Sequence, residues 1–196
     1  MAQASARVLQ TEHHGSEVDE LIDQLRPGTN RARVLRRLDE IFRSGTVPDP
    51  LPDGFLPGRL VAVSVWNPLD AAMERLGRLW MPWQGKAFSP VASNGVNRLT
   101  TSARLPLKAL FPSYTPEAVT GNDLDAFTFR TSVGPGAIDR DINVFKVDYD
   151  FEPNPGLIRR VLDELVEAGP GSYLGKILFK IRGEFRAIGF FSLRKS

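Results

Sequence analysis

The last stretch of the chain decides the fold: residues 172–194 read SYLGKILFKIRGEFRAIGFFSLR. Gly183 and Glu184 separate two runs in which aromatic and branched apolar residues alternate with small or polar ones. Such alternation is typical of strands, and a short glycine-containing break between two strands is typical of a hairpin. We therefore expect two antiparallel strands, over residues 172–182 and 185–194.

Similar strand patterns occur upstream, and they predict a sheet large enough to close on itself. The run after Gly58 is β-branched and apolar, and the two runs before Asn154 alternate with a period of two. Six to nine antiparallel strands curl into a barrel or a strongly bent sheet, which removes exposed edges and leaves an interior. The predicted upstream strands cover residues 59–65, 83–88, 124–133 and 142–149.

Helical patterns occur in four places. Residues 16–45 contain two amphipathic helices, which we expect to pack on the barrel, and 46–196 would form the barrel domain itself. Asn67-Pro68 and Asn154-Pro155 each combine a capping residue with a proline suited to the first helical turn, so two further helices are expected to interrupt the sheet, the second over 157–168. Residues 1–15 are expected to be a disordered tail, 46–58 a linker, and 89–123 short strands and turns.

Composition excludes several classes of chemistry. The chain has 196 residues, enough for one domain, and carries 25 basic and 23 acidic residues, for a net charge of +2. This charge offers no basic stripe for nucleic acid. The chain contains no cysteine, and its two histidines are His13 and His14 in the polar tail, so we expect no metal site, no cofactor and no histidine-based triad. Without a signal-like or membrane-spanning segment, a cytoplasmic location is expected.

Two segments place polar groups where an apolar wall is expected. The first is Trp83-Gln84-Gly85-Lys86-Ala87-Phe88 with the later Asn97, and the second begins at Asp148-Tyr149 and ends at Lys176. Asp148 and Asp150 would share a strand face, either as an acid–base pair or as residues at the rim. Lys176 would either lie at the surface or point inward and pair with Asp163. The candidate ligand-binding residues are Trp83, Lys86, Phe88, Asn97, Asp148, Tyr149, Arg159, Asp163, Tyr173 and Lys176.

The same residues carry a family resemblance. The order Gly58-Arg59, Trp-x-Gly-Lys-x-Phe at 83–88, Tyr149-Asp150, Leu174-Gly175-Lys176 and Phe-Phe-x-Leu at 190–193 resembles uncharacterised bacterial proteins of the GXWXG/DUF4334 type, a group similar to lipocalin-like (calycin) barrels. The resemblance spans roughly residues 55–193. It implies a small antiparallel lipocalin-like barrel with an enclosed apolar pocket, and it implies no particular activity.

Three functions remain open at this stage. The barrel could bind a small hydrophobic ligand such as a fatty acid, a polyketide or an isoprenoid. It could instead be a cofactor-independent cyclase, isomerase or decarboxylase, with a buried Lys86 or Asp163 as its acid or base. The arginine-rich face of the helix over 30–44 could dock a protein partner. The oligomeric state, a homodimer included, stays open.

Overall fold

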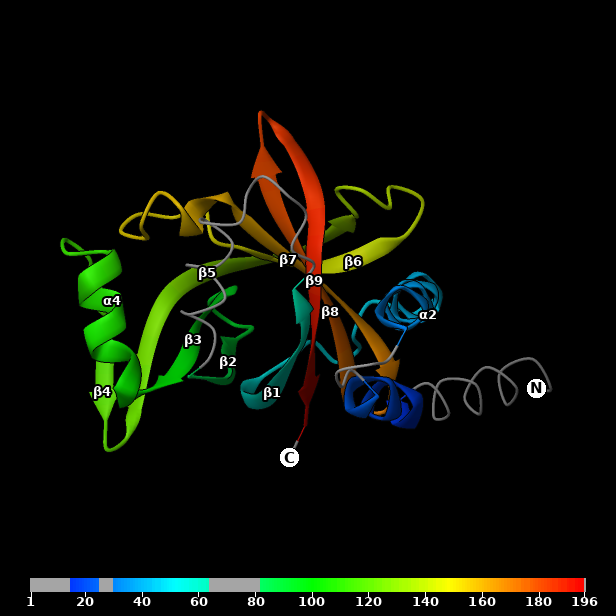
Figure 1. Ribbon diagram of the computed structural model, residues 1–196, viewed down its shortest axis with the longest axis horizontal. Coiled ribbons are helices and arrows are strands. Elements are labelled where there is room, and N and C mark those ends of the chain that lie inside the picture. The colour runs from blue at the N-terminus through cyan, green and yellow to red at the C-terminus, as the bar shows by residue number, and fades with distance from the viewer. Residues whose placement is uncertain (1–14, 25–29, 64–81, 196) are drawn as a thin grey trace.

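The protein is a closed antiparallel β-barrel, mainly β with some α, as predicted. A computed structural model describes residues 15–24, 30–63 and 82–195. Strands β1, β2, β3, β5, β6, β7, β8 and β9 each pair with their neighbours in this order, and β1 pairs with β9, so the sheet closes. The short β4 pairs with the start of β5. This up-and-down arrangement is consistent with a lipocalin-like barrel (Figure 1).

The elements follow one another along the chain with short connections. A first helix covers 15–23, and it is followed by the elements named here with their bounds: α2 (Arg31–Ser44), β1 (Gly54–Val63), β2 (Trp83–Ser89), β3 (Asn94–Thr100), η1 (Thr101–Ala103), α4 (Arg104–Leu110), β4 (Ala118–Thr120), β5 (Asp123–Pro135), β6 (Asn143–Asp148), η2 (Ile158–Arg160), β7 (Val161–Gly169), β8 (Ser172–Ile181) and β9 (Glu184–Arg194).

The helix predicted over 157–168 is wrong. The structure has the single turn η2 and then strand β7, which pairs with β6 and β8 along its length. Nearly every residue of β7 is buried, because one face lines the barrel interior and the other lies under α2. A strand that is buried on both faces has a nearly continuous apolar run, which periodicity alone does not separate from a buried helix.

Other boundaries also differ from the sequence-based expectation. Strand β1 begins at Gly54, inside the segment predicted to be a linker, and helix α4 occurs within the stretch predicted to hold only strands and turns. The helix expected from Asn67 to Trp80 lies outside the described residues, as does the tail over 1–14.

Two apolar clusters divide the molecule into an inside and an outside. The inner cluster fills the barrel and is rich in phenylalanine. The outer cluster joins the helix over 15–23 and α2 to the outer face of the barrel, through Val166 on β7 and Leu174 on β8. Figure 1 shows these two helices on one side of the barrel and α4 on the opposite side. Asn30 caps α2 by accepting a hydrogen bond from the Arg33 amide.

Gly175 is the inner-face position of β8 that leaves room for a neighbouring ring. It pairs directly with Phe191 on β9, and a Cβ atom at Gly175 would lie 2.1 Å from the Phe191 Cζ atom. The absence of a side chain at Gly175 therefore allows the Phe191 ring to lie across β8 inside the barrel.

The variant Gly175→Ala should be destabilised by about 1–3 kcal/mol, because the added methyl group must displace a packed ring. Gly134→Ala is the matched control, since a Cβ atom there would have no neighbour within 4 Å. Urea unfolding followed by circular dichroism measures both. Equal midpoints for the two variants would contradict this packing.

Candidate functional site

A β-bulge in β2 brings Trp83 and Lys86 to the same face. These residues are three positions apart, so a regular strand would place them on opposite faces. The register between β2 and β3 shifts between Trp83 and Gly85, which inserts an extra residue and reorients the first part of the strand. Gly85 has a φ of +153°, and a Cβ atom there would lie 2.1 Å from the Leu56 carbonyl oxygen. The bulge therefore depends on glycine at position 85.

Lys86 makes an ion pair inside the barrel. Its ammonium nitrogen lies 2.8 Å from Oδ2 of Asp163, and both side chains have 0% exposure. The same nitrogen donates a hydrogen bond to Asn97 Oδ1 at 3.0 Å and another to the Tyr149 hydroxyl. The four side chains come from β2, β3, β7 and the residue that follows β6, so the cluster joins opposite walls of the barrel.

Aromatic rings surround the ammonium group. The Lys86 nitrogen lies 5.0–5.6 Å from the ring centroids of four residues. Rings at this distance attract a cation through their quadrupoles, most strongly where water is excluded. Lys86 is therefore held by a carboxylate on one side and by a cage of π faces. The ring residues are Trp83, Phe129, Tyr149 and Phe191.

Asn97 and Tyr149 use their hydrogen-bonding groups within the cluster. Asn97 Oδ1 also accepts from the Trp83 indole at 3.1 Å, and Asn97 Nδ2 donates to the Tyr149 hydroxyl at 2.9 Å and to the Phe127 carbonyl at 3.3 Å. The Tyr149 hydroxyl in turn donates to Asp163 Oδ2 at 3.1 Å. Phe127 has a φ of +56°, which is unusual for an aromatic residue, and β5 is bulged against β3 at this point.

Burial shifts the pKa values of the charged pair toward their neutral forms. Loss of hydration lowers the pKa of the Lys86 ammonium and raises the pKa of the Asp163 carboxyl, while the charge of each partner opposes both shifts. Burial also raises the pKa of Tyr149 well above its usual value, so its hydroxyl keeps its proton. The cluster is therefore a connected set of proton donors and acceptors shielded from water.

A recess lies next to this cluster at one end of the barrel. About 290 Å³ of it is empty, its mouth included, and about 10 Å³ admits the centre of a water-sized sphere. That inner space is about what one water molecule needs. The lining is mostly apolar, and the polar residues that reach it belong to the cluster. The lining residues are Trp83, Asn97, Leu99, Phe127, Tyr149, Ile158 and Val161.

The remaining candidate residues lie elsewhere. Phe88 packs against other rings in the inner core, and Tyr173 lies in the inner core near another groove, away from the cluster. Asp148 is exposed, and Arg159 forms an exposed ion pair with Asp150 at 2.8 Å. An enclosed acid–base pair made from Asp148 and Asp150 is therefore not formed, because both side chains project from the rim.

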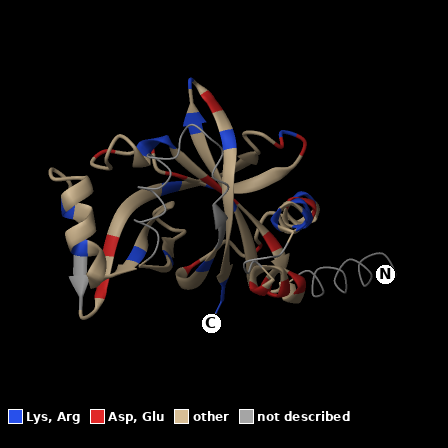
Figure 2. Ribbon diagram, in the orientation of Figure 1, with Lys and Arg blue, Asp and Glu red and all other residues tan. Residues whose placement is uncertain are grey.

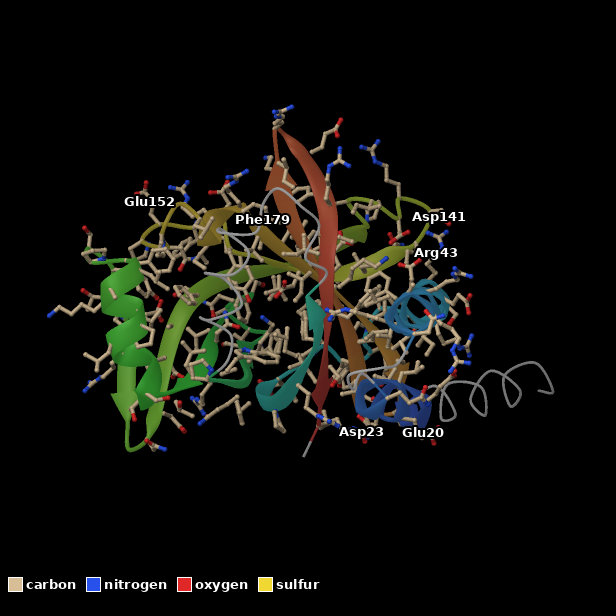
Figure 3. The ribbon with its side chains drawn as sticks, viewed as in Figure 1. Glu20, Asp23, Arg43, Asp141, Glu152 and Phe179 are labelled. Atoms are coloured by element: carbon tan, nitrogen blue, oxygen red, sulfur yellow. The ribbon has the colours of Figure 1, made fainter. Side chains whose placement is uncertain are left out.

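Lys176 lies on the outer face of β8, under α2, and does not pair with Asp163. Its nitrogen is 2.6 Å from a carboxylate oxygen of Asp39 on α2 and 2.6 Å from one of Asp139 in the loop between β5 and β6. Arg43 joins this group through Asp139 and, at 2.6 Å, through Asp141. Figure 3 shows Arg43 and Asp141 side by side at this edge of the molecule. This buried ammonium fastens α2 to the barrel.

The arginine-rich face of α2 is partly neutralised within the chain itself. Arg37 pairs with Glu17 at 2.5 Å and with Glu40 at 3.0 Å, and Arg43 has the two partners described above. Figure 2 shows acidic residues along the helix over 15–23, beside the basic residues of α2. These contacts favour a role for the two arginines in packing the helices together.

Several residues of the site were not singled out from the sequence. Phe129 and Phe191 complete the ring cage, and Leu99, Phe127 and Ile158 line the recess. A strand full of phenylalanines gives no sign of which ring faces a lysine. One usable signal was Gly175, because a glycine inside a strand marks a close approach, here by Phe191.

Comparison with known proteins gives no relative for this barrel. The chain matches no family model, no curated protein and no solved structure. Within the described ranges, no group of three or more metal-binding side chains is found. No helix in those ranges is long and apolar enough to cross a bilayer. The fold and the site thus define a closed antiparallel barrel that carries an ion pair in its interior.

Removing one member of the ion pair should destabilise the protein strongly. Lys86→Met and Asp163→Asn should each lower the free energy of unfolding by about 3–5 kcal/mol, because the partner is left buried without its counter-charge. The double variant should lose clearly less than the sum of the two. Denaturant titration of the four proteins gives this coupling, and strictly additive losses would show that the two groups do not interact.

The outer ion cluster should make stability sensitive to acid. Burial acts to raise the pKa of Asp139, but hydrogen bonds and charge from Lys176 and Arg43 outweigh it, so this pKa lies below its usual value. Such a carboxyl stabilises the fold above its unfolded pKa of about 3.9, and this contribution is lost as the pH falls through the lower folded value.

The difference in unfolding free energy between wild type and Lys176→Met should therefore be constant from about pH 5 to 7 and shrink below about pH 4. Denaturation series at each pH measure this difference. Lys108→Met, at an exposed position, is the control and should show no such trend. A Lys176→Met difference that stays the same down to pH 2.5 would contradict the role of Asp139.

Proposed function

We propose that the barrel binds a small, largely apolar molecule at the recess beside Lys86. The observation that carries this proposal is the position of the polar cluster, which is enclosed by rings and reaches an apolar recess through Asn97 and Tyr149. Ligand pockets typically combine an apolar lining with a few placed polar groups that fix the orientation of the ligand.

The cost of the buried ion pair supports a functional role. Replacing a buried ion pair with well-packed apolar residues is often neutral or stabilising, so stability alone gives little reason for Lys86 and Asp163 in this core. The strained backbone of Phe127 lies at the same place, and its carbonyl is directed to Asn97. Strain of this kind tends to collect at binding sites.

The size of the recess sets a condition on binding. Pockets for drug-sized ligands measure about 300–1,000 Å³, so a ligand larger than water requires the lining side chains to move apart. Trp83 is the side chain best placed for this, because it is partly exposed and its indole is held by a single side-chain hydrogen bond to Asn97.

Acid–base catalysis in the same chamber is the second candidate. Lys86 and Asp163 are brought toward their neutral forms by burial, and Tyr149 connects both groups to the recess. A cofactor-independent isomerase, cyclase or decarboxylase would use such a group as its acid or base. Binding is the more economical proposal, since it needs only the recess and its polar end.

The neutral probe N-phenyl-1-naphthylamine tests the binding function. Its fluorescence should rise on saturable binding to the wild type, and Val161→Phe, which fills the recess, should weaken binding about tenfold or more. Val91→Phe, at a fully exposed position, should bind as the wild type does. Ile158→Phe is a second filling variant in case Val161→Phe folds poorly. If the probe binds all variants equally, or not at all, the proposal fails.

A further inference from the structure

We infer that the ligand of this barrel is a neutral molecule that offers a hydrogen-bond donor, such as an apolar alcohol, and that carboxylates such as fatty acids are excluded. This inference rests on the proposed function and names the class of ligand. It follows from which hydrogen bonds and which charge the cluster around Lys86 has left.

The donors of the cluster are committed. The three hydrogens of the Lys86 ammonium are matched by three acceptors: Asp163, Asn97 and the Tyr149 hydroxyl. Both hydrogens of the Asn97 amide are used, and the Tyr149 hydroxyl donates to Asp163. The Trp83 indole donates to Asn97. An incoming carboxylate would therefore find no donor here that is not already bonded.

The uncommitted atom in the cluster is an acceptor. Asp163 Oδ1 is fully buried and, within the described part of the chain, has no hydrogen-bond partner, although Oδ2 of the same group has two. A buried acceptor without a partner is costly, so a donor that reaches it would be stabilised. A hydroxyl group supplies such a donor, whereas a carboxylate would add a second acceptor beside it.

Charge gives the same selection. The Lys86 and Asp163 charges already compensate each other, so an anion would bring an uncompensated negative charge into a site without water. Burying an unpaired charge is far more costly than burying a neutral hydroxyl group that is hydrogen-bonded. A neutral donor leaves the ion pair intact.

Competition against bound N-phenyl-1-naphthylamine at pH 7.5 tests the inference with three probes of equal chain length: 1-decanol, decanoate and methyl decanoate. For the wild type, 1-decanol should displace the probe at a concentration at least about tenfold lower than either of the others. Asp163→Asn removes the counter-charge of Lys86, so it should narrow or reverse the preference for 1-decanol over decanoate. Asp148→Asn, at an exposed carboxyl, should preserve that preference.

The outcomes separate the two proposals. Decanoate or methyl decanoate competing as well as 1-decanol in the wild type would overturn the inference while leaving binding itself intact. An unchanged preference in folded Asp163→Asn would also overturn it. Failure of all three probes, together with absent binding of the naphthylamine, would overturn the proposed function. If Asp163→Asn does not fold, the comparison of the three probes with the wild type still decides.

Discussion

The ion pair between Lys86 and Asp163 constrains the rest of the interior. Two opposite charges can remain in a barrel without water only when their other hydrogen-bonding capacity is met, and Tyr149 and Asn97 meet most of it. The rings around Lys86 exclude water and attract its charge at the same time. Gly175 contributes indirectly, because it makes the space for one of these rings.

The helices outside the barrel depend on a second buried lysine. Lys176 lies two strand positions from the inner face of Ile177 and Gly175 only in the sense that its side chain points the other way, toward α2. Alternation along β8 thus separates two ammonium environments: the interior holds Lys86 with one carboxylate, and the helix interface holds Lys176 with two. The first environment faces a recess, whereas the second joins α2 to a loop of the barrel.

Much of this architecture could be predicted from the sequence, and the failures have physical causes. The period-two alternation of β5, β6, β8 and β9 and the turn at Gly183 were sufficient for a closed antiparallel sheet. Strand β7 was predicted to be a helix because apolar residues cover both of its faces, and one of those faces is apolar only because α2 lies on it. That contact is tertiary, so no local pattern reports it.

The site was predictable as a set of residue types but not as an arrangement. Trp83, Lys86, Asn97, Tyr149 and Asp163 were all candidates, yet Lys176 was an equally good partner for Asp163 until the strands were placed. The bulge at Gly85 decides which lysine enters the barrel, and bulges depend on pairing with a second strand.

Nitrogen-detected NMR of the lysine ammonium groups tests the central claim most directly. The chain has six lysines, and the Lys86 signal can be assigned by its loss in Lys86→Met. The account predicts that saturating N-phenyl-1-naphthylamine shifts the Lys86 signal and leaves the signal of Lys176, on the outer face, unchanged. A probe that binds the protein but leaves Lys86 unshifted would contradict a ligand site beside the buried ion pair.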